Sequence, residues 1–254
     1  MITFDDVRCS FDAGRTWAVD GLSLEVREGE LLALLGESGS GKTTSLRLIN
    51  RLAEPTGGRV LLEGQDVANR DPVLLRRNIG YAFQSVGLFP HWSVAQNIAT
   101  VPRLLGWPET EVAARVEALL TLMGLPKSLA ARSPATLSGG QAQRVGLARA
   151  LAAKPKVMLL DEPFAALDPI RRESLQREYR QLHGALGLTT VLVTHDVTEA
   201  LLMADRLAVM EQGKLLAAGA PAELAGTAQH PVVSRLLEMP RRQAEAVRER
   251  LAAM

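Results

Sequence analysis

Short apolar stretches recur along the chain and predict the strands of a buried sheet. Residues 31–35 (LLALL) and 157–160 (VMLL) are continuously apolar, as in strands that are covered on both faces. Residues 22–27 (LSLEVR) instead alternate apolar and polar positions, which is typical of a strand with one exposed face. The pattern therefore predicts two kinds of sheet.

Two more buried strands are predicted at 189–195 and 206–210, with a helix between them at 196–204. The helical spacing is carried by Val197, Ala200, Leu201 and Ala204. Because a strand, a helix and a second strand in this order favour parallel pairing, the predicted fold class is α/β.

The middle of the chain, from about 92 to 153, is almost purely helical in pattern and predicts an inserted helical lobe. In residues 109–124 the helix should end at Gly124, a residue suited to a left-handed C-cap. Its apolar face is formed by Val112, Val116, Leu119 and Met123. Asp168 and Pro169 predict the N-cap and first turn of another helix.

Composition adds constraints rather than a function. The 254 residues carry 29 Lys+Arg and 28 Asp+Glu, so the net charge of +1 provides no basic field for nucleic acid. The single cysteine, Cys9, fits a reducing compartment. The first residues lack the layout of a signal peptide and the apolar runs are too short to span a bilayer, so we expect one compact core with lobes in the cytoplasm.

A phosphate-binding loop is the strongest chemical signal. The spacing Gly36-x-x-x-x-Gly41-Lys42-Thr43 lies between an apolar strand and a helical segment, as in a P-loop. Such a loop curls its N–H groups around an anion, and the lysine reaches the terminal phosphates. We expect the nucleotide to be bound by Gly36, Ser38, Gly39, Ser40, Gly41, Lys42, Thr43 and Thr44.

Carboxylates at the end of the strand at 157–160 predict hydrolysis. Asp161 can hold a magnesium-bound water, and Glu162 is placed to act as general base toward the attacking water. His195, after another apolar strand, could donate a hydrogen bond to the γ-phosphate. Without the P-loop, the two carboxylates could simply form a polar turn after the strand, and the histidine could have a structural role. The presence of the P-loop favours catalytic roles for all three side chains.

Two glycines at a helix start predict a second anion site. Ser138 and Gln141 fit a capping box at the start of a helix. Gly139 and Gly140 leave that start without side chains, so its N–H groups and positive dipole end are uncovered. Two anion sites for one nucleotide are satisfied most simply by two copies packed head to tail, as a nucleotide-sandwich dimer.

These motifs together resemble a known family. GESGSGKTT, LSGGQ, VMLLDEP, AALD and THD, in this order, resemble the nucleotide-binding subunit of an ABC transporter over roughly residues 2–235. The resemblance implies a P-loop NTPase with a RecA-like core, an N-terminal antiparallel β lobe and a helical lobe at about 92–153. It implies ATP and Mg²⁺ as cofactors, and leaves residues 236–254 as a short charged helical tail, expected to be a solvated helix rather than a sensor.

The resemblance also assigns roles to single residues. Gln84 is similar to the glutamine that links magnesium and the attacking water to the helical lobe, and Asp168 to the residue that communicates across the dimer. Phe11 fits the aromatic residue that stacks on adenine, with Trp17 as a rival. The implied metal ligands are Thr43, Gln84 and Asp161.

Two stretches are similar to a subfamily, the ATPases of importers for quaternary ammonium osmoprotectants such as glycine betaine, choline and carnitine. They are residues 48–64 and 87–102. The implied partners are a second copy, integral-membrane permease subunits and, indirectly, an extracytoplasmic solute-binding protein, with the chain at the cytoplasmic face of the inner membrane. The permease groove would be lined by Phe89, Pro90, His91 and Trp92.

Other interpretations stay open. Amino-acid, sulfate and polyamine importers share the LFPH pattern, and an exporter ATPase is also compatible with the motifs. A soluble ABC ATPase of DNA repair or ribosomes usually has coiled-coil insertions or two linked nucleotide domains, and this sequence shows neither. A regulatory module without turnover would lack the base, yet Glu162 is present.

Overall fold

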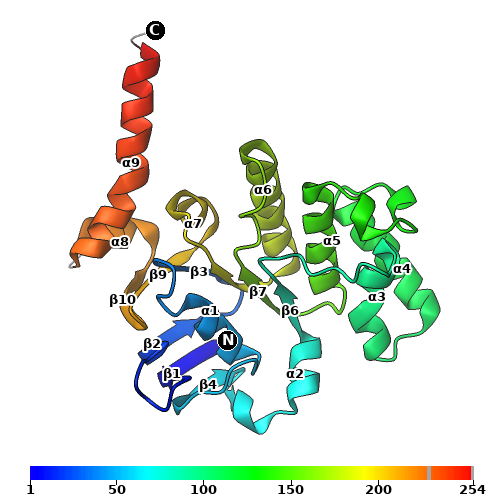
Figure 1. Cartoon of the computed structure of the whole chain (residues 1–254), viewed down its shortest axis with the longest axis horizontal. Coiled ribbons are helices and arrows are strands. Elements are labelled where there is room, and N and C mark those ends of the chain that lie inside the picture. Colours follow the sequence, from blue (N-terminus) through cyan, green and yellow to red (C-terminus); the bar gives the residue numbers. More distant parts are fainter. Residues whose placement is uncertain (228–229, 253–254) are drawn as a thin grey trace. The chain divides into compact units, whose positions relative to one another are not determined.

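The computed structural model describes residues 1–227 and 230–252 (Figure 1). The chain divides into two compact units. The first unit comprises Met1–Asp66 and Leu192–Met254, and the second comprises Val67–Val191. Strand β8 (Thr189–Val193) carries the chain from the second unit into the first.

An antiparallel sheet opens the first unit and has the strand order β2-β1-β4-β5, formed by β1 (Ile2–Cys9), β2 (Val19–Val26), β4 (Gly57–Leu62) and β5 (Gln65–Asp66). Its alternating strand β2 buries the apolar positions and exposes Ser23 and Glu25, as the sequence pattern predicts. The antiparallel lobe expected at the amino end is therefore present.

The first unit also contains parallel strands. Strand β3 (Leu31–Leu35) is buried along its whole length, as predicted, and it pairs in parallel with β9 (Arg206–Glu211). Strand β10 (Lys214–Gly219) continues this sheet in the antiparallel sense. Helix α1 (Lys42–Ile49) follows β3, and α7 (Val197–Met203) precedes β9 and buries its apolar face against the same core.

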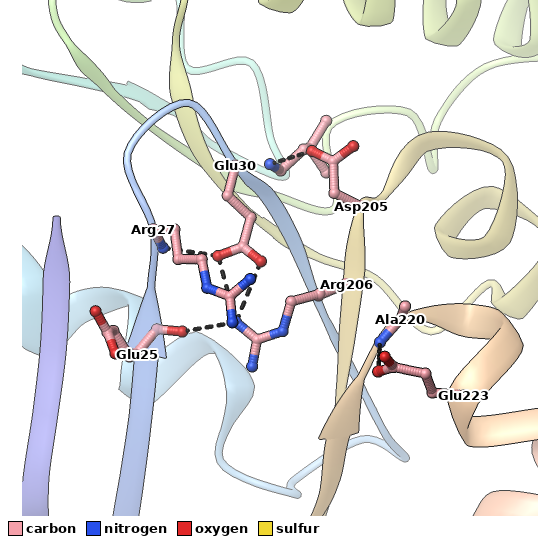
Figure 2. Close-up of polar contacts among 8 residues, drawn as sticks. Glu25, Arg27, Glu30, Asp205, Arg206, Ala220 and Glu223 are labelled. Carbon is pink, nitrogen blue, oxygen red and sulfur yellow. Dashed lines mark hydrogen bonds and ion pairs between the residues drawn. The ribbon is translucent and has the colours of Figure 1, made fainter. Parts of the chain in front are cut away.

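Charged side chains fix where β3 and β9 begin (Figure 2). The buried carboxylate of Glu30 lies 3.1 Å from the guanidinium of Arg206, which also donates to the backbone oxygen of Glu25. Asp205 accepts a hydrogen bond of 2.8 Å from the backbone N–H of Leu31. Because a buried carboxylate needs such partners, this network secures the strand that leads into the P-loop.

The first unit ends in helices α8 (Pro221–Thr227) and α9 (Pro231–Ala252). Val233, near the start of α9, is buried, whereas Val247 is exposed. Arg241 pairs with Glu245 along the exposed part of the helix. The charged tail expected at 236–254 falls in α9 as far as residue 252, and residues 253–254 lie outside the described part.

The second unit begins with η1 (Val67–Asn69), α2 (Pro72–Asn78) and β6 (Ile79–Ala82). Strand β6 pairs in parallel with the buried strand β7 (Val157–Asp161). Helix α6 (Pro169–Leu186) follows, with Asp168 as N-cap and Pro169 in its first turn, as predicted.

The helical lobe of the second unit lies between β6 and β7 in the chain (Figure 1). Helix α4 buries Val112, Val116 and Leu119, and Gly124 follows it with φ 62°, as predicted. The lobe consists of α3 (Val94–Leu104), α4 (Glu109–Leu122), η2 (Lys127–Leu129), η3 (Pro134–Thr136) and α5 (Gly139–Leu151). Among the described residues of the whole chain, no helix is long and apolar enough to cross a membrane.

Candidate nucleotide-binding site

The P-loop connects β3 to α1 through glycines whose backbone conformations other residues rarely adopt. Gly36, Gly39 and Gly41 have φ values of 152°, 80° and 101°. A Cβ atom on Gly36 would lie 2.2 Å from the backbone oxygen of Met210, and one on Gly41 would lie 2.3 Å from that of Ala18. Glycine is therefore required at both ends of the loop.

Lys42 is the first residue of α1 and is 5% exposed. Its Nζ atom donates hydrogen bonds to the backbone oxygens of Gly36 (2.8 Å) and Glu37 (2.7 Å) and to Oγ of Ser40 (3.3 Å). These acceptors compensate the burial of the ammonium group and hold it over the loop. No side chain caps the N-terminus of α1 at Gly41, which suits an anion at this position.

His195 follows β8 in the first unit and is exposed, whereas its neighbours are anchored. The hydroxyl of Thr194 donates to the buried carboxylate of Glu199 and accepts from the backbone N–H of Asp196 at 3.0 Å. Asp196 in turn caps α7 by accepting from the N–H of Glu199. Sequence reasoning missed Glu199, although the D-x-x-E spacing from Asp196 was a capping signal.

The aromatic candidates for adenine lie between β1 and β2. Phe11 is 72% exposed and Trp17 is 39% exposed, with the Trp17 ring beside Gly14. The turn is ordered by Asp12, whose carboxylate accepts from the N–H and the hydroxyl of Thr16. These hydrogen bonds lower the pKa of Asp12 below its usual value. Of the two rings, Phe11 is the more exposed.

The catalytic candidates of the second unit meet at the end of β7. Asp161 is the last residue of this strand, and its carboxylate accepts from the hydroxyl of Tyr81 at 3.2 Å. Glu162 follows with φ 46°, a left-handed conformation that is uncommon for a residue other than glycine. Nε2 of Gln84 donates to Oε2 of Glu162 at 2.9 Å. The two residues expected to handle the attacking water are thus in contact.

The LSGGQ segment forms the start of α5 as predicted. The hydroxyl of Ser138 accepts from the N–H of Gln141 (3.3 Å), whose side chain accepts from the N–H of Ser138 (3.0 Å). A Cβ atom on Gly139 would meet nothing within 4 Å, and one on Gly140 would make ordinary contact with Arg171 at 3.5 Å. Neighbours in the part of the chain that the structure describes therefore do not require these glycines, and the bare helix start is open.

Asp168 is the N-cap of α6. Its carboxylate accepts a hydrogen bond from the N–H of Arg171 at 3.1 Å and lies 3.4 Å from the Arg171 guanidinium. Half of the Asp168 side chain is exposed, at 49%. The residue therefore has a capping role within the chain and an accessible carboxylate besides.

This architecture, with a P-loop after a buried parallel strand and LSGGQ at the start of a helix in an inserted lobe, defines the ATPase cassette of ABC transporters. The sequence pattern of the ABC transporter family matches residues 19–165, and the chain belongs to this family. The predicted family is thereby confirmed, and solved ABC cassette structures similar to this chain confirm the predicted fold class.

Relatives with described cargo include osmoprotectant systems. The glycine betaine uptake system ATP-binding protein YehX of Escherichia coli (strain K12) is 50% identical over 221 residues, which are 87% of this chain and 71% of YehX. The choline transport ATP-binding protein OpuBA of Bacillus subtilis (strain 168) is 45% identical over 88% of this chain and 58% of its own length. The chain thus spans less than two thirds of OpuBA.

Relatives with other cargo reach the same identity. The spermidine/putrescine import ATP-binding protein PotA of Mesorhizobium japonicum is 50% identical over 82% of this chain and 56% of PotA. Among solved structures, the dimeric post-hydrolysis state of the ATP-binding cassette MJ0796 bound to ADP and Pi has a TM-score of 0.78 and 30% identity, covering 87% of this chain and 98% of MJ0796. These relatives are thus ATP-binding proteins of uptake, transport or import systems. A cassette similar to this chain forms a dimer with bound ADP and Pi.

Proposed function

We propose that this chain is the ATP-hydrolysing subunit of an ABC importer for quaternary ammonium osmoprotectants such as glycine betaine, choline or carnitine. The observation that carries the proposal is the 50% identity, over 221 residues, to the ATP-binding protein of a glycine betaine uptake system. The contacts of the candidate residues support the ATPase part independently of the cargo.

The P-loop binds the phosphates of ATP in this proposal. The loop N–H groups from Gly36 to Thr44 surround the β-phosphate, and Lys42 exchanges its backbone acceptors for phosphate oxygens. This exchange is favourable because an ammonium group makes stronger hydrogen bonds to charged oxygens than to neutral carbonyls. Ser38, Ser40 and Thr44 add hydroxyl donors along the same loop.

The proposed ligands of Mg²⁺ are the hydroxyl of Thr43, the side-chain oxygen of Gln84 and the carboxylate of Asp161. They are hard oxygen donors, as Mg²⁺ prefers, and Mg²⁺ commonly retains waters in place of further protein ligands. The described residues contain no group of three or more His, Cys, Asp or Glu side chains suited to a metal ion, and this site needs none. Bound Mg²⁺ would neutralise charge on the phosphate oxygens.

Glu162 is the proposed general base for hydrolysis. Its carboxylate takes a proton from the attacking water as the water oxygen bonds to the γ-phosphorus and the bond to the leaving β-phosphate oxygen breaks. Gln84, hydrogen-bonded to Glu162 at 2.9 Å, orients that water. His195 donates a hydrogen bond to the γ-phosphate as charge develops on it.

Two copies are proposed to bind two ATP molecules head to tail. Ser138, Gly139, Gly140 and Gln141 of one copy present the open start of α5 to the γ-phosphate held by the other copy's P-loop. The accessible carboxylate of Asp168 contacts the other copy and so couples the two nucleotide sites. Closure on ATP moves the permease, and hydrolysis resets the dimer.

Phe11 is proposed to stack on adenine, and this role predicts a selective loss of affinity. Phe11→Ala should raise the Kd for ATP about tenfold, because stacking of a base on an aromatic ring contributes about 1–3 kcal/mol. The Kd for inorganic triphosphate, which lacks the base, should stay unchanged. Titration calorimetry with both ligands makes the comparison, and a tenfold loss in Trp17→Ala instead would assign adenine stacking to Trp17.

The permease is proposed to dock on the aromatic residues after Gln84. Phe89 is 40% exposed and its ring centroid lies 4.5 Å from that of Trp92, with His91 against Trp92 at 5.8 Å. Phe89 and His91 are exposed and Trp92 is half-buried, and an exposed apolar patch often marks an interaction surface. Docking there would hold the chain at the cytoplasmic face of the inner membrane, next to a permease served by an extracytoplasmic solute-binding protein.

Uptake assays test the cargo. A strain lacking this chain should lose accumulation of labelled glycine betaine, choline or carnitine at high osmolarity, and a plasmid copy of the chain should restore it. Other osmoprotectant importers must be deleted in the same strain, so that redundancy does not hide the loss. Full accumulation of all three solutes without the chain contradicts osmoprotectant import.

A second candidate cargo is a polyamine, because PotA is as identical to this chain as YehX is. Labelled spermidine is therefore measured in the same strains. Loss and rescue of spermidine uptake, with osmoprotectant uptake unchanged, would keep the ATPase assignment and replace the cargo.

A further inference from the structure

Residues 83–93 connect two features of the second unit without forming a helix or strand. Near one end, Gln84 donates to the carboxylate of Glu162. At the other end lie the rings of Phe89 and Trp92. Because the segment has no regular hydrogen bonding of its own, its position depends on what holds it from outside.

The middle of this segment is held by α5. The guanidinium of Arg149 donates from one nitrogen to the backbone oxygen of Gly87 and from the other to that of Val86, both at 2.7 Å. One turn earlier, a Cβ atom on Gly146 would lie 2.7 Å from a methyl group of Val86, so the backbone of α5 closely approaches the segment. The planar fork of arginine suits a pair of adjacent acceptors.

The aromatic end is held by α3. Asn97 is fully buried, and its side chain accepts from the N–H of Phe89 at 2.8 Å. The same amide donates to the backbone oxygens of Phe89 (3.2 Å) and Ser93 (3.0 Å). The segment is therefore pinned at its aromatic end as well as at its middle.

Helix α5 also holds the residue that follows the proposed base. The side-chain amide of Gln143 donates to the backbone oxygen of Pro163, directly after Glu162. One helix thus anchors the backbone on both sides of the hydrogen bond between Gln84 and Glu162. The same helix begins at Gly139 of the LSGGQ segment.

We propose that Arg149 is a positioning residue for ATP hydrolysis, which sets Gln84 against Glu162 by holding Val86 and Gly87 on α5. The proposal rests on the function proposed above, in which Glu162 is the general base. Arg149 acts through Gln84 and makes no contact with the nucleotide. Through the same segment it links the aromatic docking residues to the hydrolytic pair.

Kinetics of the purified full-length chain test this role, with a matched control in the same lobe. Arg115 on α4 also donates to two adjacent backbone oxygens, those of Leu151 (2.7 Å) and Ala152 (3.1 Å), which lie outside residues 83–93. Arg149→Ala and Arg115→Ala therefore remove the same kind of bond. Arg149→Lys keeps the charge while losing the fork.

Arg149→Ala should lower kcat about tenfold and leave KM for ATP within about twofold, since misplaced catalytic groups slow chemistry without removing the P-loop. Arg149→Lys should fall between Arg149→Ala and wild type. Arg115→Ala should retain kcat within about twofold of wild type, even if its Tm falls by as much as that of Arg149→Ala. Rates are measured below the lowest Tm of the set, so that folding does not decide the comparison.

A double-mutant cycle shows whether Arg149 acts through Gln84. In a Gln84→Ala background, Arg149→Ala should change kcat by less than about twofold, because the group it positions is gone. A full tenfold further loss there, or equal losses in Arg149→Ala and Arg115→Ala, would overturn the positioning role. Absence of turnover in the wild-type chain would overturn the proposed function itself, and this role with it.

Discussion

Glu162→Gln should lower kcat for ATP hydrolysis about a thousandfold, because a glutamine cannot take the proton of the attacking water. The substitution keeps the size of the side chain and an oxygen that accepts from Gln84, so the local geometry at 2.9 Å is preserved. The Kd for ATP should stay within about threefold, since the P-loop is untouched. Phosphate release and titration calorimetry measure the two effects.

The matched control is Glu173→Gln on α6. Its side chain is 66% exposed and pairs with Arg177 on the helix surface. Turnover of this variant should equal that of the wild type, because an exposed ion pair contributes little to stability and none of its atoms belongs to the site. Unchanged turnover in Glu162→Gln would remove Glu162 from the role of base.

Lys42→Ala should act on binding rather than on chemistry. The Kd for ATP should rise about a hundredfold, because truncating a buried, hydrogen-bonded charge that meets an opposite charge costs about 2–5 kcal/mol. Titration calorimetry with a nonhydrolysable ATP analogue measures the Kd directly. Circular dichroism and Tm establish that the variant is folded, since its backbone acceptors at Gly36 and Glu37 lose a donor.

Lys127→Ala provides the comparison for charge alone. Lys127 is 67% exposed and pairs with Glu117 in the helical lobe. Its removal changes the net charge by the same amount as Lys42→Ala but should leave the Kd for ATP unchanged. If Lys42→Ala also bound ATP with wild-type affinity, the proposed phosphate cradle would be wrong.

The elements that the sequence predicts well are those with local causes. Continuous apolar runs identify β3 and β7, because a strand buried on both faces has no polar positions. The helix ends at Ser138 and Asp168 are predictable from capping chemistry within three residues of each cap. The glycines of the P-loop are predictable for the same reason, since their spacing reflects local backbone conformation.

Contacts between distant parts of the chain could not be predicted in the same way. The Gln84 side chain reaches Glu162, 78 residues later, through a segment without periodicity. Arg149 bonds to backbone oxygens 62 and 63 residues earlier, and backbone acceptors leave no trace in residue types. From sequence alone, an arginine in a helix is therefore interpreted as a solvated residue. Its hydrogen bonds to distant backbone oxygens become visible only in the structure.

At the start of α5, the sequence pattern could be predicted but only part of it is explained by contacts within the chain. The capping box accounts for Ser138 and Gln141, and the structure shows it formed. Gly139 and Gly140 lie in the first turn of α5 and are not among the glycines with positive φ, and a Cβ atom at either position would meet nothing closer than 3.5 Å. A partner outside the chain, as in the proposed sandwich dimer, supplies a reason that a single copy does not.

The molecular mass of Glu162→Gln in ATP and Mg²⁺, measured by light scattering, tests whether two copies share each nucleotide. A nucleotide-sandwich dimer should give an ATP-dependent doubling from the 27.4 kDa of one chain, with two ATP bound per dimer. Adding Gly140→Asp, which places a carboxylate at the start of α5, should abolish the doubling while ATP binding to the P-loop remains. A single-chain mass with ATP bound, or undiminished doubling with Gly140→Asp, would rule out a dimer that binds ATP between the P-loop and the start of α5.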